Sequence, residues 1–344
     1  MEIGMKNCKH LLLLMLLCCQ SVFAQNDKAI TKLELETRID YQRVYIGNQE
    51  INDDCGFKGK YLNFRFDANL TDDLSFSYRQ RLNKAHSNQS FFDATDWLYL
   101  NYNINKKWSV AFGKQVVAIG GYDYDRAPID SYTYSEYLNN IPCFQMGGSV
   151  SYAFNENNKL TLQICESPFR KADEDMYAYN LFWSGRFLKG FETLYSVNML
   201  EYQPGKFINY ISLGHKDRDV FGVWEIDLMI RNVVGESFSF KNLSANLRYT
   251  ANLTDKFNLL WMSSHDENRT EVAGDYCVLP GTDITRAGVG VEYYPMGNKS
   301  LRLHLFYFRM LGDNSNVAGT LVDNQNIFSF GVKWNLDLLA FKRK

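Results

Sequence analysis

The sequence predicts an all-β fold: a transmembrane antiparallel β-barrel of about sixteen strands, with a long third loop folded into the lumen. Three observations lead to this prediction. Apolar and polar side chains alternate along segments of about ten residues, short turns and longer loops join the segments in alternation, and a leader-like stretch precedes the first segment. Because lipid-facing and lumen-facing residues average out in such a barrel, a mean hydropathy of -0.32 is compatible with a membrane protein.

The N-terminal residues 1–24 have the features of a secretory signal peptide, and residues 25–344 form one predicted barrel domain. A weakly basic start at Lys6 leads into the apolar run Leu11 to Cys19, and Val22-Phe23-Ala24 supplies a small-residue cleavage site. The run is too short for a spanning helix, and no other stretch approaches eighteen apolar residues. The expected location is therefore the bacterial outer membrane, reached through the inner membrane with cleavage of the signal.

The alternation predicts sixteen strands with an even spacing of turns. Their approximate ranges are 32–45, 59–70, 74–83, 94–104, 108–117, 144–154, 159–165, 177–188, 191–202, 206–215, 220–231, 240–253, 257–264, 284–293, 300–310 and 326–338. Seven short turns on one side and eight longer loops on the other are typical of bacterial outer-membrane barrels. The soluble alternative is an open sheet whose polar face lies in bulk water.

Hairpin geometry gives an independent check, because cross-strand partners must share a face. Centring the turn at Thr71-Asp72-Asp73 pairs residues whose numbers sum to 144, which places the apolar residues together and Arg65 opposite Arg79. Six of the seven short turns agree in this way. The turn around Lys216 to Asp219 does not resolve, because Phe207 to His215 alternates too weakly to choose a face.

The connection between Gly113 and Gly148 is the longest, with about 28 residues rich in Tyr, Asp and Gly after Gln115. A sixteen-stranded barrel is wide enough to leave an aqueous channel, so something must narrow it. We therefore expect this third loop to set the constriction. The expected constriction residues are Lys114, Tyr122, Asp123, Tyr124, Asp125, Arg126, Asp130, Tyr134 and Glu136.

Two segments around this loop carry a family resemblance: Ala111 to Gln115 (AFGKQ) leads into it, and Ile141 to Gly148 (IPCFQMGG) leads out of it. With the signal peptide and the strand pattern, the chain resembles the phosphate-selective porin O and P family, and its Asn-, Tyr- and Asp-rich loops resemble a Bacteroides-type outer-membrane porin. The resemblance implies passive, ligand-selective diffusion, homotrimers and a basic ladder along the pore. The third loop departs from that ladder, since Arg126 is its single arginine and four acidic residues accompany it. We therefore do not extend the family's phosphate selectivity to this chain.

Arginines recur on the face that the alternation assigns to the lumen. They are Arg38, Arg65, Arg79, Arg81, Arg186, Arg231, Arg248, Arg286 and Arg302. Those of the first three strands are expected to form one basic wall, and an acidic third loop facing it would create a transverse field that sets ion preference. The alternative is that lumen arginines pair with nearby acids, as Arg186 could with Glu192.

Other functions receive less support from the residues. The loop tyrosines could form a stacking track for sugars or only fix the loop to the wall. His265-Asp266-Glu267, expected in an outer loop, could suggest a base or metal site, but a solvated loop tip accounts for it. Acidic outer loops could serve a surface-binding or structural role. Catalytic residues, metal sites and cofactors are not expected.

The predicted function is therefore a porin, a passive diffusion channel for small hydrophilic solutes or ions. Its expected partners are the lipid bilayer, lipopolysaccharide, small solutes or anions and two further copies of the chain. A net charge of -2 gives no indication of nucleic-acid binding. The cysteines left after cleavage, Cys55, Cys143, Cys165 and Cys277, match no metal motif; although an exported chain could pair them, we interpret them as free or incidental.

Overall fold

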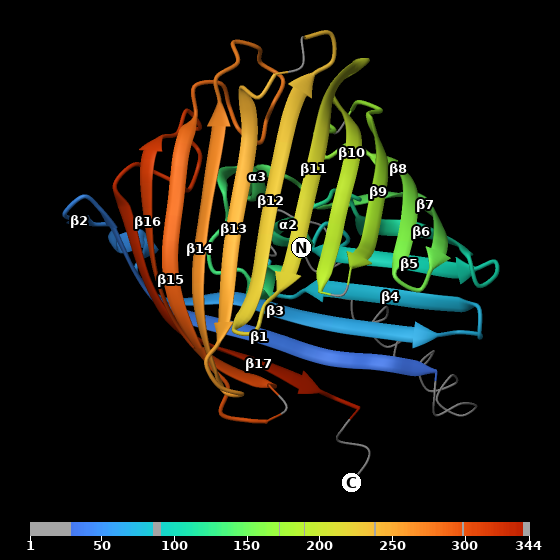
Figure 1. Ribbon diagram of the computed structural model, residues 1–344, viewed down its shortest axis with the longest axis horizontal. Helices are drawn as coiled ribbons and strands as arrows, with labels where there is room; N and C mark the ends of the chain where they lie inside the picture. Colours follow the sequence, from blue (N-terminus) through green and yellow to red (C-terminus); the bar gives the residue numbers. More distant parts are fainter. Residues whose placement is uncertain are drawn as a thin grey trace, which may run out of the picture.

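The computed structural model describes residues 29–84, 91–171, 173–188, 190–236, 239–297 and 299–339, and the predicted signal peptide lies outside them. Within these ranges the chain is almost entirely strand (Figure 1). The strands are β1 (Ile30–Ile46), β2 (Gln49–Glu50), β3 (Gly56–Asn69), β4 (Leu74–Arg81), β5 (Thr95–Asn103), β6 (Trp108–Val116), β7 (Phe144–Asn155), β8 (Asn158–Glu166), β9 (Tyr177–Leu188), β10 (Phe191–Gln203), β11 (Lys206–Arg218), β12 (Gly222–Val233), β13 (Asn242–Asn252), β14 (Phe257–Asn268), β15 (Asp283–Tyr293), β16 (Leu301–Asp313) and β17 (Gln325–Asp337). The short helices are η1 (Asn52–Asp54), α2 (Tyr122–Asp125), η2 (Pro128–Asp130) and α3 (Glu136–Asn140).

The sheet closes on itself as an antiparallel barrel. Sixteen long strands in the described residues pair in chain order, and β1 pairs with β17 on one side and with β3 on the other. The two-residue β2 only extends the end of β1. Closure leaves no long unpaired edge, which a sheet in lipid requires. The predicted strand number and order are confirmed.

The register confirms the hairpin prediction as well, with Arg65 opposite Arg79 across β3 and β4. Exposure then separates the two faces of the wall. In β8, Leu162 is 54% exposed and the next residue, Gln163, is 3% exposed; in β10 the corresponding pair is Val197 at 53% and Asn198 at 0%. At these positions apolar side chains lie on the outside and polar side chains on the inside.

Aromatic side chains form a band at the short-turn ends of β6 to β9. The ring of Trp108 lies 4.7 Å from that of Tyr152, Phe154 follows at 4.9 Å from Tyr152, and Trp183 at 5.5 Å from Phe154. Such amphipathic rings are enriched at the membrane interface of barrels. None of the helices in the described ranges has the length and apolar character needed to span a membrane.

One connection differs from expectation, and the longest one lies where it was expected. The link between β10 and β11 is only Pro204-Gly205, a tight turn with Gly205 at φ +72°, where a longer loop was expected. The strand whose inward face the sequence did not define, β11, continues to Arg218. Its register with β12 runs from Ile208 opposite Val233 to Arg218 opposite Val223. The longest connection in the described residues is 117–143, between β6 and β7, and it contains α2, η2 and α3.

Candidate functional site

Segment 117–143 is bonded to the polar faces of strands that lie far apart in the ring. Near its start, Gly120 N donates to Ser196 Oγ of β10 at 2.8 Å. Farther on, Ser131 O accepts a hydrogen bond of 2.5 Å from Arg38 Nη1 of β1, and Tyr134 Oη lies 2.9 Å from Tyr61 Oη of β3. β10 and β1 are eight strands apart by either route round the barrel, through β3 to β9 or through β17 to β11. In Figure 1, α2 and α3 are seen within the outline of the strands.

The start of the segment approaches the wall so closely that only glycine fits. Gly121 has φ +106°, a region that side chains disfavour. A Cβ added to Gly214 of β11 would lie 2.8 Å from Gly121 Cα, and one added to Gly120 would lie 2.6 Å from Leu194 O. The glycines at the loop start therefore fix where the segment leaves the wall.

Two buried carboxylates of the wall hold the two α-helices of the segment. Asp227 of β12 accepts hydrogen bonds of 2.7 Å from the backbone N–H groups of both Tyr122 and Asp123, where α2 begins. Asp266 of β14 accepts one of 2.7 Å from Glu136 N, where α3 begins. The first turn of a helix leaves its N–H groups without internal partners, and the carboxyl oxygens of Asp227 and Asp266 accept hydrogen bonds from them.

These anchors correct one expectation and add a residue. His265-Asp266-Glu267 lies inside β14 rather than in an outer loop, and Asp266 is 1% exposed. Asp227 was not singled out from the sequence. The signal is present in the alternation, because Asp227 lies on the inward face between the outward-facing Ile226 and Leu228.

On the side of β10 to β12, apolar packing holds the segment. Tyr124 and Tyr137 share a buried cluster with Leu200 of β10 and with Ile208 and Tyr210 of β11. Burial raises the pKa of the Tyr124 and Tyr137 hydroxyls well above the usual range. Ile208 and Tyr210 thus make part of the inner face of β11 apolar, which explains why Phe207 to His215 alternates weakly. These buried tyrosines fix the loop to the wall and are not available as a sugar track.

On the side of β15 to β17 and β1, ion pairs hold the segment. The Asp130 carboxylate of η2 accepts from Arg302 Nη1 at 2.8 Å and from Lys333 Nζ at 2.6 Å. Burial opposes ionisation of Asp130, but Lys333 and Arg302 outweigh it and hold the pKa of the carboxyl below its usual range. Nearby, Tyr132 Oη donates to Glu292 Oε1 at 2.5 Å.

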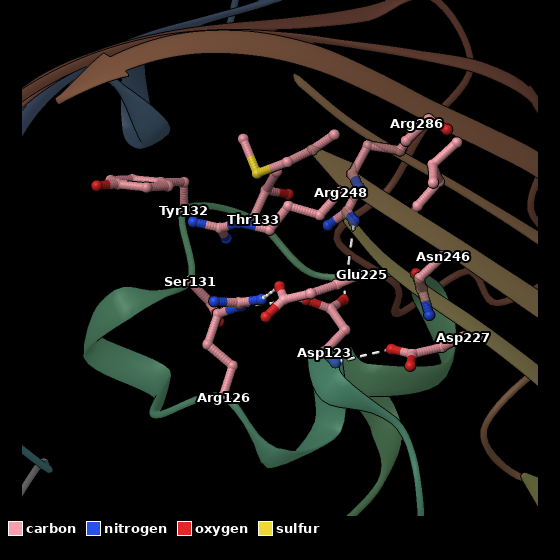
Figure 2. A pocket seen from close by; sticks show the side chains of 13 residues that line it. Asp123, Arg126, Ser131, Tyr132, Thr133, Glu225, Asp227, Asn246, Arg248 and Arg286 are labelled. Atoms are coloured by element: carbon pink, nitrogen blue, oxygen red, sulfur yellow. Dashed lines mark hydrogen bonds and ion pairs between the residues drawn. The ribbon is translucent and has the colours of Figure 1, made fainter. Parts of the chain in front are cut away.

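A narrow cleft lies between the segment and β12 to β15, and Figure 2 shows the side chains that line it. Arg126 forms an ion pair with Glu225, and Arg286 Nη2 lies 4.0 Å from Asp123 Oδ2. Arg286 is only 4% exposed, yet its Nε and Nη1 have no partner in the described residues, and neither has Nε of Arg248. The cleft has room for about one water molecule. Two guanidinium groups therefore present unpaired donors to a confined polar space.

The predicted constriction residues from Tyr122 to Glu136 all lie in this segment, but Lys114 does not belong with them. Lys114 lies in β6 opposite Leu98 and Met146, which share the apolar face. Its ammonium donates to Phe92 O at 3.0 Å, in the loop between β4 and β5. The side chain of Lys114 is held at that rim and does not reach the segment. The prediction that Lys114 lies with the constriction residues is therefore wrong.

The expected basic wall is also altered, because strand carboxylates pair with most of its arginines. The pairs are Arg38 with Asp40 at 2.5 Å, Arg65 with Asp67 at 2.8 Å, Arg79 and Arg81 with Asp96 at 3.0 and 3.2 Å, and Arg186 with Glu192 at 3.0 Å. Of the arginines on the first three predicted strands, only Arg38 has a hydrogen bond or ion pair with the segment in the described part of the chain. Asp123 and Asp130 of the segment lie near Arg286, Arg302 and Lys333 instead. This wall comes from the end of the chain.

The described residues offer little support for metal-binding or thiol chemistry. The groups of His, Cys, Asp and Glu there include no set of three or more positioned for a metal ion. Cys55, Cys143, Cys165 and Cys277 are free thiols. Cys143 lies at the end of the segment, and burial raises the pKa of its thiol to about 11.

Comparison with known structures places the fold among outer-membrane channels. The outer membrane channel DcaP of Acinetobacter baumannii matches with a TM-score of 0.63 at 12% identity, over 88% of this chain and 96% of that chain. The anion-selective porin from Comamonas acidovorans matches with 0.62 at 9% identity, over 90% and 99%. OmpT of Vibrio cholerae in its trimer form matches with 0.59 at 13% identity, over 90% and 100%. At these identities the likeness is one of fold.

Sequence comparison is more specific about kinship. No curated protein matches the chain. The model of the family described as phosphate-selective porin O and P matches residues 31–203, which is half of the chain. The match contains β1 to β10 and the whole of segment 117–143. The chain therefore belongs to the phosphate-selective porin O and P family.

Proposed function

We propose that segment 117–143 crosses the lumen and forms the constriction of a passive diffusion channel that favours small anions. The channel itself follows from family membership and from the sixteen-stranded barrel, which support an outer-membrane location and a non-enzymatic role. One observation carries the finer proposal: the segment is bonded to β10 through Gly120 and to β1 through Ser131, at opposite points of the ring. A chain held at both points leaves solutes only the space beside it.

The charge balance at the cleft supports anions as the favoured solutes. Asp130 is neutralised by two cations of the wall, and Glu225 by Arg126. The guanidinium groups of Arg248 and Arg286 retain donors without partners in the described residues. In a confined, partly desolvated passage such donors attract and orient anions. The proposal concerns small anions as a class.

The test is the reversal potential of single channels in a planar bilayer with a KCl gradient. We expect anion preference in the native protein and a shift toward cations in Arg248→Ala/Arg286→Ala, because the cleft then loses two positive charges, one of them 4.0 Å from Asp123. Arg186→Ala is the matched control: it removes one arginine that pairs with Glu192 at the short-turn end, and the side chain of Arg186 is 48% exposed. An unchanged reversal potential in the double variant would exclude both arginines from selectivity.

We also propose that three copies associate in the membrane. The trimer form of the structurally similar Vibrio cholerae OmpT supports this, as does the apolar outer surface, on which Phe112 is 71% and Leu305 58% exposed. The remainder of that surface would contact the lipid bilayer, with the outer rim against lipopolysaccharide. Chemical cross-linking in native outer membranes should give a ladder that ends at three chains. A ladder that ends at one chain would contradict the proposal.

A further inference from the structure

Two further loops reach α3 from the side of the barrel that carries the longer loops. In the connection between β14 and β15, Cys277 O accepts a hydrogen bond of 3.0 Å from Asn140 Nδ2. In the connection between β16 and β17, Asn316 Nδ2 donates to Glu136 Oε1 at 2.9 Å. Glu136 and Asn140 are the first and last residues of α3. Three loops thus meet on one short helix of the proposed constriction.

Each of these loops is itself fixed to the barrel. The Asp275 carboxylate, 1% exposed, accepts from Arg231 Nε at 2.7 Å and from Asn242 Nδ2 at 3.0 Å, and also from Cys277 N at 2.8 Å. This clamp ties the loop between β14 and β15 to β12 and β13. A loop held in this way presents Cys277 O to α3 at a fixed position.

The connection between β16 and β17, residues 314–324, is folded back on itself. Asn314 Nδ2 donates to Leu321 O at 2.9 Å, and Leu321, 3% exposed, belongs to the buried cluster of Phe306 and Phe308 in β16. The loop approaches α3 tightly, because a Cβ added to Gly319 would lie 3.1 Å from Glu136 Oε1. The loop therefore has one defined place against the helix.

Glu136 is an unusual residue for this junction. It is 0% exposed, and its side-chain hydrogen bonds come from two neutral amides, Asn140 Nδ2 at 2.7 Å and Asn316 Nδ2 at 2.9 Å. Its Oε2 has no partner in the described residues. A buried carboxylate without a cation is costly for stability. The carboxylate is well suited to one task, which is to accept a hydrogen bond from Asn316 of the loop between β16 and β17 beside the one from Asn140 of its own helix.

We infer that the loop between β16 and β17 is a second wall of the constriction, positioned by the pair Asn316–Glu136. The inference rests on the proposed function, in which segment 117–143 narrows the channel. Asn316 is a positioning residue: it acts on the passage through α3. When the pair is broken, α3 loses its shortest hydrogen bond to this loop while Asp266 still holds its first turn.

The test uses a swap of the two polar groups. Asn316→Asp is isosteric and places a second carboxylate against Glu136. Hydrogen bonds to charged groups contribute about 1.5–3 kcal/mol, so the ratio of docked to undocked loop should fall about tenfold or more. The readout is the rate of open-channel fluctuations in single-channel records. In the double variant Glu136→Gln/Asn316→Asp, the amide introduced in α3 donates to the carboxylate introduced in the loop, and the records should return to the quiet native form.

Controls separate this inference from the proposed function and from misfolding. Asn326→Asp makes the same chemical change in β17, where Asn326 Oδ1 accepts from Tyr307 Oη, away from α3. Heat-modifiable mobility on gels verifies that each variant is a folded barrel. Quiet records from Asn316→Asp, or noise that persists in the double variant, would overturn the inference alone. A native protein that conducts no current would overturn the proposed function.

Discussion

The two sides of the barrel hold segment 117–143 by different forces. Toward β10 and β11 apolar packing dominates the contact, with Tyr124 and Tyr137 in one cluster with Leu200 and Tyr210. Toward β15 to β17 and β1 the contact is ionic and centred on Asp130. Apolar burial hardly responds to pH or salt, whereas an ion pair responds to both. We therefore expect the contacts on the apolar side to change little with pH and salt, and the contacts on the ionic side to weaken or strengthen with both.

The largest effect is expected from a cavity on the apolar side. Leu200 is 0% exposed, so Leu200→Ala should lower the free energy of unfolding by about 2–5 kcal/mol. Urea unfolding in detergent micelles, followed by tryptophan fluorescence, measures the change. Leu200→Met keeps the volume and should cost less than about 1.5 kcal/mol. Equal stability of the Ala and Met variants would contradict the packing of this side.

A smaller effect is expected from the ionic side. Asp130→Asn removes the partner of both Arg302 and Lys333, but the Asp130 side chain is 32% exposed and partly screened. The expected cost is about 1–3 kcal/mol, between the values for exposed and buried pairs. The same urea experiment applies, with Asp72→Asn in an exposed turn as the control. If Asp130→Asn were as costly as Leu200→Ala, the two sides would not differ as described.

The smallest effect is the pH dependence that Asp130 contributes on the ionic side. The pKa of Asp130 is lowered in the folded protein, so its contribution is present above the unfolded value of about 3.9 and is lost as the pH falls through the folded value. Between pH 7 and pH 3 the native protein should lose more stability than Asp130→Asn does. Parallel pH profiles for the two proteins would show that Asp130 is not the responsive group.

The same contrast decides how much the sequence could predict. Where the inner face is polar, the period of two is legible, and the strand order and the pairing of Arg65 with Arg79 were predicted correctly. Where segment 117–143 packs on β11, Ile208 and Tyr210 make the inner face apolar. The alternation of polar and apolar residues weakens there because the inner face of β11 contacts segment 117–143 and not water. A weak alternation in a barrel strand thus indicates an internal contact.

The site was predicted as a segment but not as a set of partners. The period assigns a face to each residue, but it does not say which strand lies across the lumen from which. The segment therefore faces Arg302 and Lys333 near the end of the chain, and not Arg65, Arg79 and Arg81. Contacts between loops, such as Asn316 with Glu136, carry no period at all and emerge only from the fold.

Single-channel conductance tests the central claim most directly. The native protein is compared in a planar bilayer with a variant in which residues 122–137 are replaced by a short Gly-Ser linker, and gel mobility verifies that both are folded barrels. If the segment narrows the lumen, the shortened variant conducts several-fold more current than the native channel and loses its ion preference. Equal conductance and equal preference in the two proteins would contradict the account.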